Sequence, residues 1–193
     1  IDPTSNYAKA AAAAMGRSMD DTIIAALGGS AQAGVAGATA VALPATSKFA
    51  TGSQSDGLTI AKLIAAKKFF DLNDVDPSIP RYIVCGATQI SDLLGTTEVT
   101  SSDFNTVKAL AMGDVDSYLG FKFILSNRLA FDATHTDDRK IFAFTQDAIK
   151  LGIGKDITAK IDVRPDKSYA TQVYTCMSIG SVRMEENKVF QIP

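Results

Sequence analysis

The sequence has few of the residues that build metal centres and crosslinked scaffolds: two cysteines, one histidine and no tryptophan among 193 residues. Cys85 and Cys176 lie far apart and form no CxxC pair, which excludes a disulfide scaffold and a cysteine-rich zinc site. This cysteine usage fits a reducing compartment. The single histidine, His135, excludes chemistry that needs several imidazole ligands.

An excess of positive charge is also missing. Nineteen Lys and Arg stand against 21 Asp and Glu, so the formal net charge at pH 7 is −2. Neutralising phosphates needs clustered basic side chains, and the overall composition therefore argues against a strongly basic nucleic-acid-binding face. With 46% hydrophobic and 21% charged residues, the chain has the composition of a globular protein and not of a disordered one.

Neither a secretory signal nor a membrane span is visible. The sequence begins at Ile1 without Met, and we interpret it as a processed product or a piece of a longer protein. Residues 22–47 carry no charge, but they consist largely of Ala, Gly, Ser and Thr and include Pro44. A spanning helix needs ~20 predominantly apolar residues, so we expect no membrane partner.

Sequence motifs for nucleotide binding and hydrolysis are absent as well. The glycines of the N-terminal third do not follow the GxGxxG spacing, and neither GxxxxGK[ST] nor GxSxG occurs in the sequence. The sequence therefore gives no support for a phosphate-binding loop or for a serine hydrolase with a nucleophile elbow.

One polar cluster remains as a candidate site. Carboxylates and an imidazole that lie close together can bind a divalent ion or act as an acid and base. The cluster consists of Asp132, His135, Asp137, Asp138 and Arg139. We interpret it as a polar loop between two strands, because no Gly shapes it and no fourth ligand is defined. We therefore predict no catalytic, cofactor-binding or metal-binding residue and no cofactor.

The Ala-rich start predicts one long helix at residues 7–27, ended by the glycines at 28 and 29. About 21 residues at ~1.5 Å each give a rod of roughly 30 Å. Arg17 and Asp21 are expected to form a solvated pair on its outer side. The apolar stripe consists of Ala8, Ala12, Met15, Met19, Ile23 and Ala26. We predict that Met19 and Ile23, at its centre, are largely buried against strands.

Short helices and strands follow, with the strands concentrated at the end, which predicts an α+β class. Helices are expected at 58–73, 87–94 and 102–112, and a helical turn at 146–151. Strands are expected at 39–43, 81–85, 120–126, 139–144, 157–163, 169–177 and 182–192. The alternation in 157–163 predicts a half-buried antiparallel strand.

Two burial predictions follow from these elements. The helix at 58–73 has apolar side chains on two faces, so we expect it to be covered on both sides, with Lys62, Lys67 and Lys68 directed outward. Cys85 ends a buried strand and Cys176 lies within another. Both are therefore predicted to be small apolar fillers with unreactive thiols.

Four segments, taken in order after the long helix and the Gly/Ala-rich stretch, carry a family resemblance. Residues 81–94, RYIVCGATQISDLL, form a strand that ends in a small-residue turn and leads into a helix. Residues 120–127 follow a Gly and end in a polar turn, 140–149 combine a strand with a turn, and 180–192 place basic and acidic residues before a last strand. This order resembles the major capsid proteins of tailed double-stranded DNA bacteriophages.

The resemblance implies the Hong Kong 97-type capsid fold, an α+β fold with a long spine helix. It implies a peripheral domain at 1–57, an inserted axial domain at 58–155 and the closing strands of the peripheral domain at 156–193. It further implies a structural protein, not an enzyme, that assembles with copies of itself as pentamers and hexamers. The resulting icosahedral head would enclose double-stranded DNA without sequence-specific recognition.

The resemblance also implies partners and a location. Scaffolding and portal proteins would be partners during assembly in the host cytoplasm, and the product would be the virion capsid. Family members carry an N-terminal arm and an extended loop before the spine helix. Because this sequence shows neither, we expect the chain alone not to form closed shells.

Two alternatives stay open from the sequence. An encapsulin-type nanocompartment shell would have the same fold and enclose cargo enzymes in place of a genome. A small soluble enzyme or binding domain would use the loop at 132–139.

Overall fold

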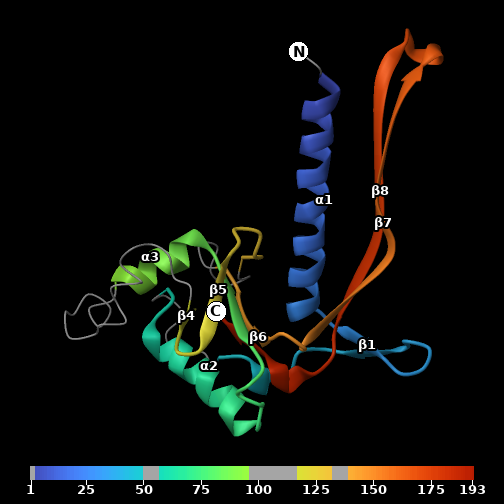
Figure 1. Ribbon diagram of the computed structural model, residues 1–193. Helices are drawn as coiled ribbons and strands as arrows, with labels where there is room; N and C mark the ends of the chain where they lie inside the picture. Colours follow the sequence, from blue (N-terminus) through green and yellow to red (C-terminus); the bar gives the residue numbers. More distant parts are fainter. Residues whose placement is uncertain (1–2, 50–56, 96–116, 132–138) are drawn as a thin grey trace.

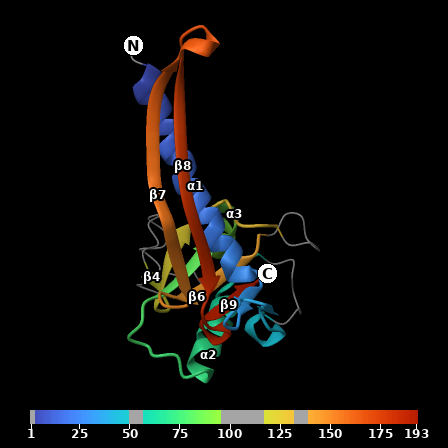
Figure 2. The same ribbon diagram turned by 90° about the vertical axis from the view of Figure 1, so that its right-hand side faces the viewer.

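The structure is a computed structural model that describes residues 3–49, 57–95, 117–131 and 139–193. It has two parts, a long upright rod and a five-stranded sheet with helices beside its base (Figure 1). The rod consists of a helix and a two-stranded hairpin that run side by side in both views (Figures 1 and 2).

The rod is built from the N-terminal helix and from a hairpin in the last quarter of the chain. Its helix is α1 (Pro3–Gly28), whose 26 residues give a length of roughly 40 Å. Its hairpin pairs β7 (Ile149–Arg164) with β8 (Ala170–Arg183) in antiparallel register. The hairpin turns through the short 3-10 helix Pro165–Lys167, and Ser168 and Tyr169 after it have positive φ angles of 52° and 58°.

The sheet has the strand order β4-β5-β3-β6-β9, with β3 parallel to β5 and antiparallel to β6. Its strands are β4 (Ser117–Tyr118), β5 (Phe121–Leu125), β3 (Arg81–Cys85), β6 (Ile141–Thr145) and β9 (Val189–Ile192). Two helices accompany it, α2 (Ile60–Leu72) and α3 (Ala87–Gly95). A small hairpin of β1 (Ala31–Ala33) and β2 (Thr39–Val41) follows α1, and short 3-10 helices lie at Ala45–Ser47 and Glu186–Lys188.

Strand alternation gives the sheet a hydrophobic core on each face. Successive residues of a strand point to opposite faces, so Ile83 packs in one core and Val84 in the other. The larger core lies against α2 and α3 and includes Leu58, Leu63, Phe70, Ile83, Leu93, Phe121 and Phe190. The smaller core joins the opposite face to the C-terminal end of α1 and consists of Leu27, Leu43, Val84, Leu129, Phe142, Ala148 and Val189.

Several predicted elements are confirmed. The helices expected at 7–27, 58–73 and 87–94 are present as α1, α2 and α3, and α1 begins earlier than expected, at Pro3. The strands expected at 39–43, 81–85, 120–126 and 139–144 correspond to β2, β3, β5 and β6. The helix expected at 102–112 lies outside the described residues.

The predicted burial of the α1 stripe against strands is confirmed in part. Met19 and Ile23 are half-buried, and within the described side chains of α1 only Leu27 is fully buried. The reason is that only the end of α1 reaches the sheet. Along the rest of its length the helix packs on one side against a hairpin, which cannot enclose it.

The predicted surroundings of α2 are wrong for its covering on both sides and for Lys62, whereas Lys67 and Lys68 are directed outward as predicted. The helix buries one face, on which Leu63, Ala66 and Phe70 follow helical spacing, while Leu72 is 72% exposed. Lys62 is buried and not directed outward, because its Nζ donates hydrogen bonds to the carbonyls of Gly57 and Pro193. The sheet covers one side of α2, and the other side of the helix is exposed to solvent.

Two further local predictions are wrong. The helical turn expected at 146–151 is a tight turn closed by a 3.0 Å hydrogen bond from the Ala148 N–H to the Thr145 carbonyl, after which β7 begins at Ile149. The strand expected at 157–163 is confirmed as antiparallel, but it is almost entirely exposed, since no second sheet covers the hairpin.

Candidate functional site

The β7–β8 hairpin has two faces of different chemistry. Opposed residues of an antiparallel pair lie on the same face, and the face turned toward α1 is fixed by Ser181, whose hydroxyl donates to the Thr22 carbonyl at 2.7 Å. We call this the inner face; it includes Leu151, Ile153, Ile161, Val163, Val173, Ile179 and Ser181. We call the opposite one the outer face; it includes Lys150, Lys155, Thr158, Lys160, Asp162, Gln172, Tyr174, Cys176 and Ser178.

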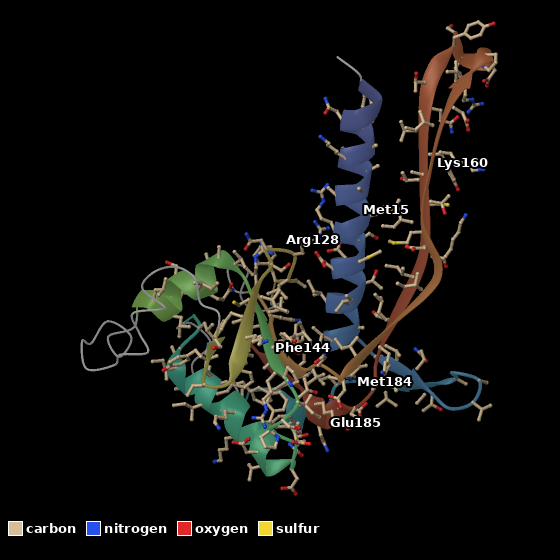
Figure 3. All side chains as sticks on the ribbon, viewed as in Figure 1. Met15, Arg128, Phe144, Lys160, Met184 and Glu185 are labelled. Carbon is tan, nitrogen blue, oxygen red and sulfur yellow. The ribbon has the colours of Figure 1, made fainter. Side chains whose placement is uncertain are left out.

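The inner face is apolar, and α1 covers it incompletely. Ile179 near the base is half-buried, whereas Ile161 and Val163 in the distal half are 46% and 57% exposed. Figure 3 shows Met15 on the side of α1 that faces the hairpin. Apolar side chains that stay exposed along one face mark a surface for contact with another molecule.

Arg183 joins the rod at its base. Its buried guanidinium donates hydrogen bonds to the carbonyls of Leu27, Gly29 and Val41 at 3.1, 2.6 and 3.0 Å. The last carbonyls of a helix lack hydrogen-bond partners within the helix and form the negative end of its dipole. A cation at this position therefore donates hydrogen bonds to these carbonyls and also interacts favourably with the dipole. One side chain from β8 thereby holds the end of α1 and the strand β2 together.

An ion pair connects the rod to the sheet. Arg128, after β5, forms a two-pronged hydrogen-bonded pair with the carboxylate of Asp21 on α1, which lowers the pKa of that carboxyl. The pair lines a cavity of about 380 Å³ together with Lys48, Lys140 and Phe142. The expected pairing of Asp21 with Arg17 is therefore wrong, because a partner that is distant in sequence offers bidentate geometry.

A second ion-pair group fixes the base of the hairpin. Lys188 lies 2.6 Å from Asp147, in the turn before β7, and 3.2 Å from Glu185. Hydrogen bonds from Lys188 and from the Thr145 hydroxyl lower the pKa of Asp147. The turn that enters the hairpin and the segment that leaves it are thus tied to each other.

The polar cluster identified in the sequence is described only at Arg139; Asp132, His135, Asp137 and Asp138 lie outside the described residues. The Arg139 guanidinium donates to the carbonyls of Asn127 and Leu129 and lies 4.3 Å from the ring centroid of Phe131. Its role is therefore to hold the segment after β5. The part of the chain that the structure describes contains no group of three His, Cys, Asp or Glu placed to hold a metal ion.

The two cysteines differ from each other, contrary to the prediction. Cys85 is fully buried, and burial raises the pKa of its thiol to about 11, as expected for an unreactive filler. Cys176 is half-buried on the outer face, where a hydrogen bond from Lys155 lowers the pKa of its thiol. The predicted burial is confirmed for Cys85 and wrong for Cys176, while the reactivity of the two thiols stays a prediction.

Sequence reasoning missed Arg183, although the sequence contains a signal. Residues 168–182 carry no charge, and Arg183 is the first charged residue after them, at the end of a strand. An arginine is almost never fully buried unless it is paired, so a single charged residue at the end of an uncharged strand is a candidate for such a paired site. The described helices include none that is long and apolar enough to cross a membrane.

Comparison with sequence families gives one match over the whole chain. A model of the family described as phage capsid protein matches residues 1–193. A search of curated proteins finds no match.

Comparison with solved structures gives several matches that cover nearly all of this chain. A chain of Mycobacterium phage Che8 matches with a TM-score of 0.70 and 18% identity, covering 96% of this chain and 61% of that one. The capsid of cyanophage P-SCSP1u matches with a TM-score of 0.71 and 18% identity, covering 100% and 66%. The capsid of cyanophage Pam1 matches with a TM-score of 0.67 and 16% identity, covering 100% and 68%. This chain thus spans 61–68% of the length of these three chains.

Proposed function

The chain belongs to the phage capsid protein family and has the Hong Kong 97-type fold, and we propose on this basis that it forms the shell of an icosahedral phage head with copies of itself. Membership makes it a structural protein of the virion capsid and not an enzyme, so the alternative of an enzyme at the loop 132–139 is set aside. A match to a phage family also favours a phage head over an encapsulin-type compartment.

The two parts of the fold suggest how the domains divide. We assign the rod of α1 and β7–β8 to the peripheral domain, and the sheet with α2 and α3 to the axial domain around which pentamers and hexamers close. The sequence suggested boundaries near 57 and 155, with all of 156–193 peripheral. Because β9 pairs with β6, we now place 189–192 with the axial sheet.

One structural observation supports assembly most directly: the rod leaves an apolar face uncovered. Ile161 and Val163 lie on the inner face, on a hairpin that extends well away from the sheet (Figure 2). A protein that acts alone gains nothing from such an exposed face, whereas contact with neighbouring copies would bury it. Stable interfaces bury about 1,200–2,000 Å² in total, an area that an elongated rod can supply.

The proposal also includes what the phage head contains and which proteins take part in its assembly. The head encloses double-stranded DNA without sequence-specific contacts, and scaffolding and portal proteins join during assembly in the host cytoplasm. The slightly acidic net charge of −2 is compatible with DNA that is enclosed and not bound tightly over the whole inner surface.

Electron microscopy of particles formed by the complete capsid protein tests the assembly proposal. The variant Ile161→Lys/Val163→Lys places two charges on the inner face and should give only small oligomers, since burying an unpaired charge is costly. The control Leu72→Lys changes an even more exposed apolar residue, on α2, and should give normal particles. Circular dichroism should show that both variants keep their helices. Normal particles from the double variant would contradict the proposed role of the inner face.

A further inference from the structure

Charge is distributed unevenly between the hairpin and the rest of the chain. Residues 149–183 contain six Lys and Arg against three Asp, a net charge of +3. All other residues together contain 13 Lys and Arg against 18 Asp and Glu, a net charge of −5. The positive charge is thus concentrated in one element although the chain as a whole is slightly acidic.

The outer face carries most of this positive charge. Lys150, Lys155 and Lys160 are exposed there, opposite residues of β8, a strand without any acidic residue. Figure 3 shows Lys160 directed away from α1. Within the described residues, none of these three ammonium groups lies within ion-pair distance of a carboxylate.

The neighbours of the three lysines are mostly uncharged donors. Thr158, Gln172 and Ser178 share the outer face with them. Three acidic side chains also belong to the hairpin: Asp156 follows Lys155 in the irregular part of β7, Asp162 lies on this face, and Asp166 pairs with Arg164. Ammonium, hydroxyl and amide donors along an exposed strand are the groups that contact phosphate oxygens without reading bases.

We propose that the outer face of the hairpin binds the phosphate backbone of the enclosed DNA, an inference that rests on the proposed function. Lys150 and Lys160 pair with Val182 and Tyr174, which are eight residues apart on β8, because β7 has two irregularities between them. At ~3.3 Å per residue the two lysines are therefore about 26 Å apart along the hairpin. This is less than one helical turn of B-form DNA, about 34 Å, so the three lysines can contact one side of a duplex within a single turn. In this arrangement the outer face of the hairpin would point toward the interior of the head.

An acidic surface on a second copy of this chain is the alternative partner for the outer face, and three of the described carboxylates are poorly suited to that role. Asp21, Asp71 and Asp147 are already paired with Arg128, Arg81 and Lys188, respectively. These carboxylates are neutralised within their own chain and are poor partners for an added cation. DNA, in contrast, presents one unpaired negative charge per ~1.7 Å of its length.

Fluorescence anisotropy with labelled duplex DNA of about 30 base pairs and arbitrary sequence tests the proposal on the 193-residue chain. Neutralising three phosphates gives a slope of log K against log salt of about −2.7, or roughly 40-fold weaker binding at 200 mM than at 50 mM salt. The variant Lys150→Gln/Lys155→Gln/Lys160→Gln should lose at least tenfold in affinity at about 50 mM salt, and its slope should approach zero.

The matched control removes the same amount of charge from other surfaces. Lys9, Lys68 and Lys122 are exposed on α1, α2 and β5, and their replacement by Gln should change DNA affinity by less than about twofold. An equal loss in the control, or no binding of the unaltered chain at 50 mM salt, would overturn the proposal.

A further measurement separates this inference from the assembly proposal. Particle formation by the complete protein is scored for the same triple variant. Particles that form normally with reduced affinity for DNA support the inference. Loss of particles with unchanged affinity for DNA would identify the outer face as a contact between copies and overturn the inference, while the assembly proposal would stand.

Discussion

Replacing Arg183 with Met removes the joint at the base of the rod. The methionine keeps part of the apolar stem and loses every donor, so the carbonyls of Leu27, Gly29 and Val41 lose a shared partner. Two of these carbonyls lie at the C-terminal end of α1, where the helix dipole also favours a positive charge. The change therefore acts on the helix, the hairpin and β2 at once.

The expected loss in the free energy of unfolding is about 3–5 kcal/mol, because three carbonyls lose hydrogen bonds from one charged donor. Each hydrogen bond from a charged donor contributes about 1.5–3 kcal/mol. Part of that sum is offset, because a buried Arg183 bears a desolvation cost and its Nε has no hydrogen-bond partner within the described part of the chain. Against a total stability of about 5–15 kcal/mol, the loss is large.

Urea unfolding followed by far-ultraviolet circular dichroism measures this loss. With a denaturant slope of about 2 kcal/mol/M, the midpoint should fall by about 1.5–2.5 M. The matched control is Arg164→Met at the other end of the hairpin, where an exposed ion pair with Asp166 contributes about 0–1 kcal/mol. Hydrogen exchange at the amide of Gly29 should become faster in the Arg183 variant alone.

A conservative variant separates the effect of charge from that of hydrogen bonding. Arg183→Lys keeps the positive charge, but one ammonium group cannot match the spread of the guanidinium donors, so its midpoint should lie between those of Arg183→Met and the unaltered chain. If Arg183→Met and Arg164→Met lowered the midpoint equally, the joint would contribute nothing particular and the reasoning would be refuted.

Two other outcomes follow from titratable groups. The pKa of Asp147 is lowered in the folded protein. The stability from its contacts with Lys188 is therefore present above the unfolded pKa of about 3.9 and is lost as the pH falls through the lower, folded pKa. Urea midpoints measured from pH 6 downward should decline less steeply for Asp147→Asn than for the unaltered chain, and an unchanged pH profile would contradict the assignment. Cys176 should react quickly with a maleimide reagent, because its thiol is half-buried beside Lys155, and Cys85 should react slowly, because its thiol is fully buried. Peptide mass spectrometry measures both rates. Equal rates would show that burial does not protect the thiol of Cys85.

Local patterns predicted most of the elements because their signals are contained within a few residues. β3 was predicted with its observed bounds, since an apolar run between Pro80 and Gly86 is a local signal for a buried strand. The long helix was predicted for the same reason, because its Ala content and its terminal glycines need no distant partner. The order of the elements was enough to indicate the capsid fold.

Long-range partners account for what the sequence could not predict. The Nζ of Lys62 binds the carbonyl of Pro193, 131 positions away, and the guanidinium of Arg183 binds that of Leu27, 156 positions away. No periodicity contains such information, because it depends on how the chain ends meet in space. The exposure of Ile161 could not be predicted for a related reason: alternation indicates that a strand has two faces, but not whether a second layer covers one of them.

The rod of α1 and the hairpin is joined to the sheet near one end, which makes it a lever arm. The two strands of the hairpin are closed at the base by a 2.8 Å hydrogen bond from the Met184 N–H to the Ala148 carbonyl, and their distal turn lies far from the sheet (Figure 1). Fourteen to sixteen residues per strand at ~3.3 Å give an arm of about 50 Å. A rotation of about 10° at the base would therefore displace the tip by roughly 9 Å. Small adjustments among the few bonds at Arg183 and Lys188 are thus amplified into large changes in where Tyr169 meets its surroundings.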